Sequence, residues 1–166
     1  MPKATLSNAA GPSSEDLARV AESLSTLSRA FTLARPHEHL LKEAGVRLDR
    51  AGSALLFKLS RHRSDSLRVS DLAELLGIDT PSVTRKIQQL ERLGYVTSVT
   101  DPDDKRAKRI SLTRTGEKTI ERILTAIHNR LARLFTDWTS EELTPFVASL
   151  ERFATSLTNE MENDRD

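Results

Sequence analysis

Two short capped helices joined by a tight turn, between residues 69 and 94, constrain the fold of this 166-residue chain most. Ser70 is suited to cap the first helix, and Gly77 has the backbone freedom needed just after its end. Thr80 is suited to cap the second helix, with Pro81 at the first helical position, where a missing N–H costs nothing. This arrangement predicts a helix-turn-helix for duplex DNA, with Ser70 and Thr80 near the DNA backbone.

The helix that begins at Thr80 has one apolar and one polar side. Val83, Ile87 and Leu90 recur at helical spacing and are expected to face inward. The opposite face has suitable chemistry for base edges, because Arg can bind guanine and Gln can bind adenine through two hydrogen bonds. A solvated polar face is the alternative for this helix taken alone, but the capped helix before it and the basic hairpin after it favour DNA. We expect base contacts from Ser82, Arg85, Gln88 and Gln89, phosphate contacts from Lys86 and Arg92, and a further DNA contact from Thr84.

A basic hairpin is predicted after this helix. Residues 95–100 are rich in aromatic and β-branched types, which favour a strand, and residues 101–104 are typical of a turn. Such a hairpin can reach a minor groove, whose negative potential attracts arginine, and an exposed charged turn without a partner is the equally weighted alternative. Asp104 is expected to accept a hydrogen bond from Arg106 and to fix the direction of that side chain. The predicted DNA-binding residues of this wing are Asp104, Lys105, Arg106, Lys108 and Arg109.

The same residues resemble the MarR family of bacterial transcription regulators. The wing signature is similar in Asp101-Pro102-x-Asp104-x-Arg106 and Leu112-Thr113-x-x-Gly116, and the recognition helix is similar in Thr80–Arg85 and Leu90–Gly94. The resemblance extends over nearly the whole chain. It implies a homodimeric winged helix-turn-helix repressor that binds a pseudo-palindromic operator in double-stranded DNA and is released by a small-molecule effector. Effector-binding residues vary within the family, so none is carried over to this chain.

Long amphipathic helices are predicted on both sides of this unit. One begins at Ser13 or Ser14 and ends or kinks at Pro36, a second is capped by Thr113, and a third begins with the capping box of Thr139 and Glu142. Their long apolar stripes have little else in the chain to cover them, which predicts an oligomer interface. The predicted fold is mainly α with a small β-hairpin wing, a winged helix-turn-helix with N- and C-terminal dimerisation helices.

The predicted elements divide the chain into five parts. We expect a disordered tail at 1–12, dimerisation helices at 13–45, the winged DNA-binding unit at 46–116, connecting and C-terminal dimerisation helices at 117–160, and a frayed tail at 161–166. Within the second and third parts, a short helical segment from His37 to Glu43 precedes a helix that begins near Asp49. In that helix, Ala51, Leu55, Leu56 and Leu59 are expected to face the core.

Composition and charge narrow the function classes. Between Lys58 and Arg114, twelve basic and eight acidic side chains give a net charge of +4, whereas the rest of the chain has −3. The positive charge is therefore concentrated where the DNA contacts are predicted. The chain has no cysteine, which excludes disulfides and thiol redox sensing, including the peroxide-sensing branch of the MarR family. No apolar run approaches the roughly 20 residues of a membrane span, and residues 1–11 lack a signal-peptide core, so we expect a soluble cytoplasmic protein without a membrane partner.

Two other function classes are weaker. A winged-helix module that binds a protein, without sequence-specific DNA binding, is the alternative, although nothing in the sequence favours it. An enzymatic function is the weakest hypothesis. The sequence contains no glycine-rich phosphate loop and no Ser, His and Asp residues at the spacing of a catalytic triad. No cofactor is expected, and no metal site either, because His37 and His39 are two residues apart and do not share a helix face.

Overall fold

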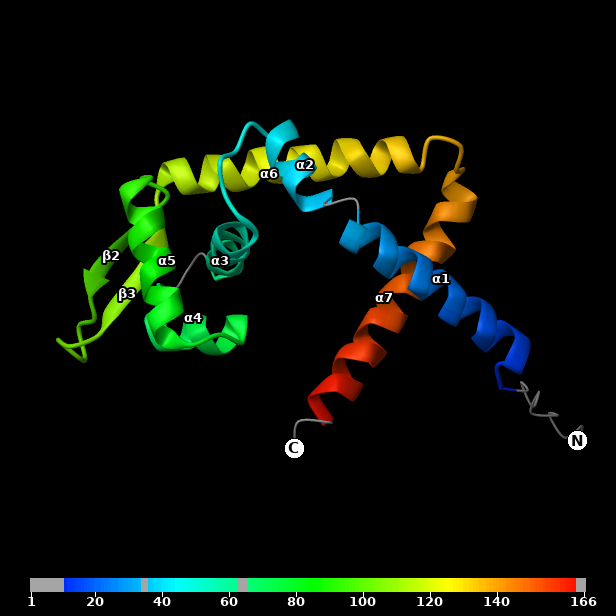
Figure 1. The fold of residues 1–166 in the computed structure, drawn as a ribbon, viewed down its shortest axis with the longest axis horizontal. Helices are drawn as coiled ribbons and strands as arrows, with labels where there is room; N and C mark the ends of the chain where they lie inside the picture. Colours follow the sequence, from blue (N-terminus) through cyan, green and yellow to red (C-terminus); the bar gives the residue numbers. More distant parts are fainter. Residues whose placement is uncertain (1–10, 34–35, 63–65, 164–166) are drawn as a thin grey trace, which may run out of the picture. The chain divides into compact units, whose positions relative to one another are not determined.

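The fold of the chain is mainly helical with one small sheet (Figure 1). A computed structural model describes residues 11–33, 36–62 and 66–163. Most of the tail predicted at 1–12 and part of the tail predicted at 161–166 lie outside these residues. The elements in chain order are α1 (Ser14–Leu33), α2 (Pro36–Glu43), α3 (Arg50–Arg61), β1 (Leu67–Arg68), α4 (Val69–Leu76), α5 (Thr80–Arg92), β2 (Val96–Thr100), β3 (Lys108–Leu112), α6 (Arg114–Leu134) and α7 (Ser140–Asn163).

The sheet has three antiparallel strands in the order β1-β3-β2. The predicted hairpin is confirmed: Val96 pairs with Leu112 at its base and Thr100 pairs with Lys108 next to its tip. The sequence did not predict β1, whose Leu67 pairs with Ile110. A strand of two residues is too short to show the alternation of apolar and polar side chains by which strands are recognised.

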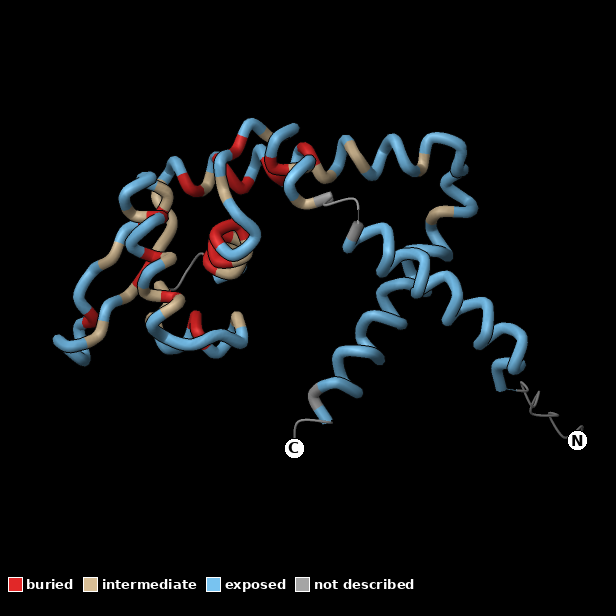
Figure 2. The backbone as a smooth tube through the Cα atoms, viewed as in Figure 1, coloured by how far each residue is buried: buried red, intermediate tan, exposed pale blue. Residues whose placement is uncertain are grey.

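The hydrophobic core lies between α3, α4, α5, the sheet and the start of α6, and buried positions gather on these elements in Figure 2. In α3 the prediction for Ala51 is wrong, because Ala51 is exposed and Gly52 lies on the buried face with Leu55, Leu56 and Leu59. Spacings of three and four residues set this face. The fully or nearly buried core side chains are Leu55, Leu56, Leu59, Leu72, Ala73, Val83, Ile87, Leu90, Val96, Ile110 and Ile120.

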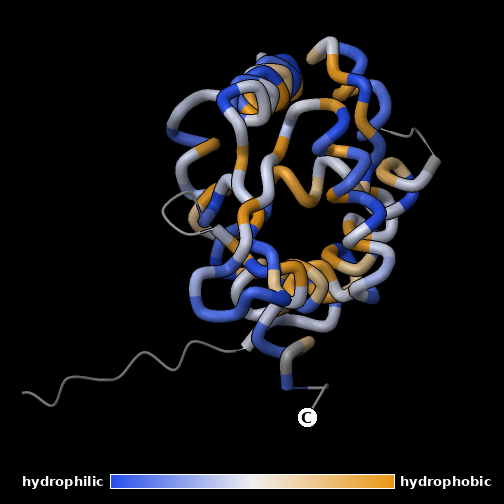
Figure 3. The backbone as a smooth tube through the Cα atoms, turned by 90° about the vertical axis from the view of Figure 1, so that its left-hand side faces the viewer, coloured by the Kyte–Doolittle hydropathy of each residue, from blue (hydrophilic) through white to orange (hydrophobic). Residues whose placement is uncertain are grey.

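By its contacts the chain divides into two compact units, Met1–Ala126 and Ile127–Asp166. In the first unit, the apolar stripe of α1 is exposed, with Phe31 at 69%. In the second unit, Phe135, Trp138 and Phe146 pack edge to face or tilted, with ring centroids 5.2–5.9 Å apart. Figure 3 shows hydrophobic and hydrophilic positions interspersed along the helical turns of the chain.

Candidate nucleic-acid interface

The turn between α4 and α5 forms as the sequence predicts. Gly77 ends α4 with φ +64°, and its N–H and that of Ile78 donate to carbonyls of the last helical turn. This left-handed C-terminal cap suits glycine because a side chain would strain that conformation. Only three residues therefore separate the two helices, and α5 begins at Thr80.

Both helix starts differ from the prediction by one or two residues. Asp79, not Thr80, caps α5, because its carboxylate accepts a hydrogen bond from the backbone N–H of Ser82 at 2.9 Å. Ser70 is not the cap of α4, which begins at Val69 after the extended Arg68. The Asp71 carboxylate accepts a hydrogen bond from the Arg68 backbone N–H at 3.2 Å and so stabilises the earlier start. Ser70 and Thr80 remain exposed in the first turns of the two helices.

The inner face of α5 is packed as predicted. Val83, Ile87 and Leu90 are 0–4% exposed and lie in the core. Because this face fixes the rotation of the helix about its axis, it also decides which side chains face solvent. On the outer side, Arg85, Gln88, Gln89 and Arg92 are exposed, whereas Ser82, Thr84 and Lys86 are half-buried.

Two of the half-buried side chains are already hydrogen-bonded. The Thr84 hydroxyl donates to the Thr80 carbonyl at 2.9 Å. Lys86 Nζ donates to Asp49 Oδ2 at 2.5 Å and to Gln89 Oε1 at 2.8 Å. Asp49 is 37 residues earlier in the chain and caps α3, so spacing alone does not indicate its contact with Lys86. Partial burial alone would raise the pKa of Asp49. The hydrogen bonds from Lys86 and Gly52 together have a larger, opposite effect, so the pKa of Asp49 lies below its ordinary value.

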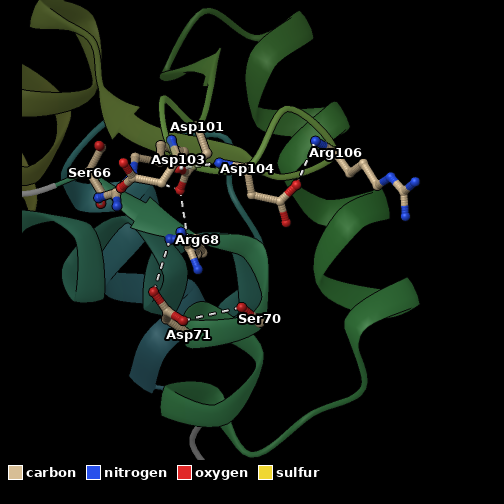
Figure 4. Close-up of polar contacts among 9 residues, drawn as sticks. Ser66, Arg68, Ser70, Asp71, Asp101, Asp103, Asp104 and Arg106 are labelled. Atoms are coloured by element: carbon tan, nitrogen blue, oxygen red, sulfur yellow. Dashed lines mark hydrogen bonds and ion pairs between the residues drawn. The ribbon is translucent and has the colours of Figure 1, made fainter.

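The wing presents three exposed cations on its tip and return strand, namely Lys105, Arg106 and Lys108. Asp104 Oδ1 accepts a hydrogen bond from the backbone N–H of Arg106 at 2.9 Å, and Figure 4 shows the Arg106 guanidinium extending away from that carboxylate. The prediction that Asp104 accepts from Arg106 is correct for the main chain. The prediction that Asp104 also fixes the direction of the Arg106 side chain is wrong, because this hydrogen bond is to the backbone and stabilises the tight turn.

The remaining predicted wing cation, Arg109, is held in a hydrogen-bond network centred on the buried Asp101. Asp101 is 1% exposed. Its Oδ2 accepts hydrogen bonds from Arg68 Nε at 2.7 Å and from Arg109 Nε at 2.8 Å. Its Oδ1 accepts from the backbone N–H groups of Asp103 and Asp104 at 2.9 and 3.2 Å. The hydrogen bond from Arg68 holds the pKa of Asp101 well below its ordinary value, against the opposing effect of burial.

This network joins the wing to the entry of the helix-turn-helix (Figure 4). Arg68 belongs to β1 and directly precedes α4, Arg109 belongs to β3, and Asp101 begins the tip between β2 and β3. The sequence placed Asp101 in a turn and in the wing signature, and it placed Arg68 only among the local positive charges. Asp101 is followed by Pro102, Asp103 and Asp104, so no local signal distinguished it from the exposed acids of the same turn.

The far end of the wing is anchored by Thr113 and Gly116. Thr113 caps α6 as predicted: its hydroxyl accepts from the Gly116 N–H at 3.1 Å and donates to the Gly94 carbonyl at 2.6 Å. A Cβ on Gly116 would lie 2.1 Å from the Tyr95 carbonyl oxygen. The close approach of two backbones therefore explains the spacing of Thr113 and Gly116.

The described residues were also compared with the requirements of a metal site and of a membrane-spanning helix. His37 Nε2 lies 2.9 Å from Ser53 Oγ, which joins α2 to α3. Over the described residues, no group of three or more His, Cys, Asp or Glu side chains is arranged to hold a metal ion. None of the helices described has the length and apolar character to cross a bilayer.

Comparison with known proteins agrees with this geometry. Residues 53–108 match the family model described as MarR family. A mutant of S. aureus MepR bound to an oligodeoxyribonucleotide is 25% identical with a TM-score of 0.60, over 81% of this chain and 97% of that chain. A crystal structure of MarR is 26% identical with a TM-score of 0.67, over 84% of this chain and 94% of that chain. The YusO protein from Bacillus subtilis shares the fold, with 23% identity and a TM-score of 0.67 over 87% of this chain and 99% of that chain. Within residues 53–108 the chain is therefore similar to the MarR family, and its fold is the winged helix-turn-helix of these transcription regulators.

Proposed function

We propose that this chain acts as a homodimeric repressor that binds a pseudo-palindromic operator in double-stranded DNA and is released by a small-molecule effector. The observation that carries the proposal is the outer face of α5, where exposed arginine and glutamine side chains are held over an apolar inner face in the core. Arg and Gln match the hydrogen-bonding pattern of purine edges in the major groove. Because operators lie on the chromosome, we infer that the protein acts in the cytoplasm.

The DNA contacts in this proposal follow from which side chains are exposed. Arg85, Gln88, Gln89 and Arg92 are exposed on α5, with Ser82 beside them. Lys105, Arg106 and Lys108 are the wing cations offered to DNA, whereas Asp104 and Arg109 shape the wing through hydrogen bonds to the Arg106 backbone N–H and to Asp101. Ser70 and Thr80 lie in the first turns of α4 and α5, where backbone N–H groups favour phosphate.

Dimerisation in this proposal rests on exposed apolar surface. On α7, Phe146, Val147, Leu150, Phe153 and Leu157 recur at helical spacing and are 38–52% exposed. The stripe of α1 is exposed as well, and exposed apolar stripes of this length favour association. A twofold dimer would place two α5 helices about 34–36 Å apart, one turn of DNA. We therefore assign residues 13–45 and 117–160 to dimerisation and residues 46–116 to DNA binding.

Repression and its release follow from the same arrangement. A dimer bound across a promoter blocks transcription, and a ligand releases it only if it binds more tightly to a conformation with low affinity for DNA. An in vitro transcription assay on the bound promoter measures whether the purified protein lowers transcript yield. Addition of candidate effectors to the same assay then measures release, and a rise in transcript without added effector would contradict repression.

Titration of the full-length protein onto DNA from the region upstream of its own gene tests the binding. We expect sequence-specific affinity that falls with salt by about 0.9 log units per log unit of salt for each phosphate neutralised. Arg85→Ala, which changes an exposed side chain without touching the core, should reduce specific affinity about 5- to 150-fold and relax specificity at one base pair. Equal affinity for all sequences, or an affinity independent of salt, would overturn the proposal. The remaining hypothesis would then be a winged-helix module that binds a protein.

A further inference from the structure

Gln88 and Gln89 are neighbours on the outer side of α5, yet their surroundings differ. Gln89 Oε1 accepts a hydrogen bond from Lys86 Nζ at 2.8 Å. The Gln88 side chain is exposed and makes no hydrogen bond with another residue of the described ranges. One glutamine is therefore held by a charged partner, and the other is free to rotate.

The partner of Gln89 is itself tethered to another helix. Asp49 Oδ1 accepts a hydrogen bond from the Gly52 N–H at 2.8 Å, which fixes the carboxylate at the N-terminus of α3. Its Oδ2 accepts from Lys86 Nζ, whose side chain is only 18% exposed. A chain of hydrogen bonds thus runs from the start of α3 through Asp49 and Lys86 to Gln89.

This contact determines which way the Gln89 amide faces. An ammonium group has only donors, so the amide atom beside Lys86 Nζ is the carbonyl oxygen and not the NH₂ group. Nε2 then keeps both of its N–H donors for a ligand. Recognition of adenine through two bonds would require Oε1 to accept from the adenine amino group while Nε2 donates to N7. Oε1 has a second lone pair, but an adenine amino hydrogen that approached it would lie close to the ammonium charge of Lys86, which repels it.

We propose that the Asp49–Lys86 pair makes Gln89 a reader of acceptor atoms, so that it selects guanine over adenine at its base pair. Guanine presents two acceptors in the major groove, O6 and N7, and no donor there. Asp49 is then a positioning residue for base selection, although it does not face the bases itself. This inference rests on the proposed function, because it concerns the operator that α5 reads.

Selection of binding sites from a randomised DNA library, followed by sequencing, tests the inference with the full-length protein. Gln89→Ala first locates the base pair that Gln89 reads, as the position where selectivity is lost. At that position we expect the unsubstituted protein to prefer guanine to adenine by about fivefold or more. Lys86→Met should remove or reverse this preference, and Lys86→Arg, which retains donors and charge, should restore it. Gln88→Ala is the matched comparison: because Gln88 is expected to contact another base, it should change selectivity elsewhere in the site and leave the Gln89 position unchanged.

A second variant separates orientation from charge. Asp49→Ser retains a cap for α3 but cannot reach Lys86, so it should weaken the guanine preference while the charge on α5 is unchanged. A preference for adenine in the unsubstituted protein would overturn the inference, as would a Lys86→Met protein that loses affinity equally for all sequences. The inference would also be overturned if the Gln89→Ala protein kept its base selectivity at every position. If the unsubstituted protein enriches no sequence at all, the proposed function fails instead, and the inference fails with it.

Discussion

Arg68 Nε lies 2.7 Å from Asp101 Oδ2, so the residue that directly precedes α4 is bonded to the residue that begins the wing tip. The same oxygen accepts from Arg109, and the other carboxylate oxygen accepts two backbone N–H groups of the tip. Asp101→Asn removes the charge that balances two arginines, and its NH₂ group cannot accept. We expect a lower melting temperature and weaker DNA binding. An equivalent change in an exposed acid of the same tip, Asp103→Asn, should leave the melting temperature unchanged in differential scanning fluorimetry.

The stability of the fold should fall in acid through the same residue. The pKa of Asp101 is lowered from its ordinary value of 3.8, mainly by the hydrogen bond from Arg68. Below that ordinary value the unfolded chain binds a proton that the folded chain still excludes, so unfolding becomes easier as the pH falls. The contribution is fully present above pH ~4 and is lost progressively below it. Urea unfolding between pH ~5 and ~3 should show a steeper loss for the unsubstituted protein than for Asp101→Asn, and parallel curves would contradict this assignment.

Local sequence signals predicted the elements well and their contacts across the chain poorly. The cap at Thr139, the left-handed Gly77 and the inward row of Val83, Ile87 and Leu90 each depend on residues within a few positions, and the structure has them as predicted. Competing caps were harder, because Asp79 and Thr80 are both good candidates and only the backbone shows which one accepts.

The contacts that shape the candidate site could not be predicted, because they join distant residues. Arg68 and Asp101 are 33 residues apart, and Asp49 and Lys86 are 37 apart. A count of charges treats Lys86, Arg106 and Arg109 alike. In the fold, Lys86 is paired with Asp49, Arg109 is paired with the buried Asp101, and Arg106 is exposed. Spacing in the sequence indicates which face of a helix a side chain is on, but not what another element places beside it.

The two arginines of the wing should therefore separate binding from stability. Arg106→Ala removes an exposed guanidinium with no partner role in the core, so we expect weaker DNA binding, a smaller salt dependence by about one phosphate, and an unchanged melting temperature. Arg109→Ala removes a donor to buried Asp101 and to the Ser66 carbonyl, so we expect a lower melting temperature. Fluorescence anisotropy over a salt series, with thermal unfolding of the same samples, measures both. If Arg106→Ala destabilised the fold as much as Arg109→Ala, the division of roles would be wrong.

The close backbone approach at Gly116 should tolerate no side chain. A Cβ there would lie 2.1 Å from the Tyr95 carbonyl oxygen and 3.1 Å from Leu112 Cδ2. Because the nearest atom belongs to the backbone, relief requires the strand to shift, and Gly116→Ala should lower the free energy of unfolding by about 1–3 kcal/mol. Gly11→Ala is the control, since a Cβ there meets nothing within 4 Å. Chemical denaturation of the two variants measures the difference, and equal midpoints would refute the packing argument.

The apolar stripe of α7 should determine the oligomeric state. Leu150 is 52% exposed within one chain, so Leu150→Glu adds charge to the stripe without entering the monomer core. If the stripe is the dimer interface, burying that carboxylate is costly, and sedimentation equilibrium at micromolar concentration should show a monomer. Ala148→Glu adds the same charge on the opposite side of the helix, where Ala148 is also exposed, and should leave a dimer. Circular dichroism should show equal helix content in both variants. The dimer proposal requires that Leu150→Glu also weakens operator binding, because a monomer contacts only one half-site; a fully dimeric Leu150→Glu protein would place the interface elsewhere.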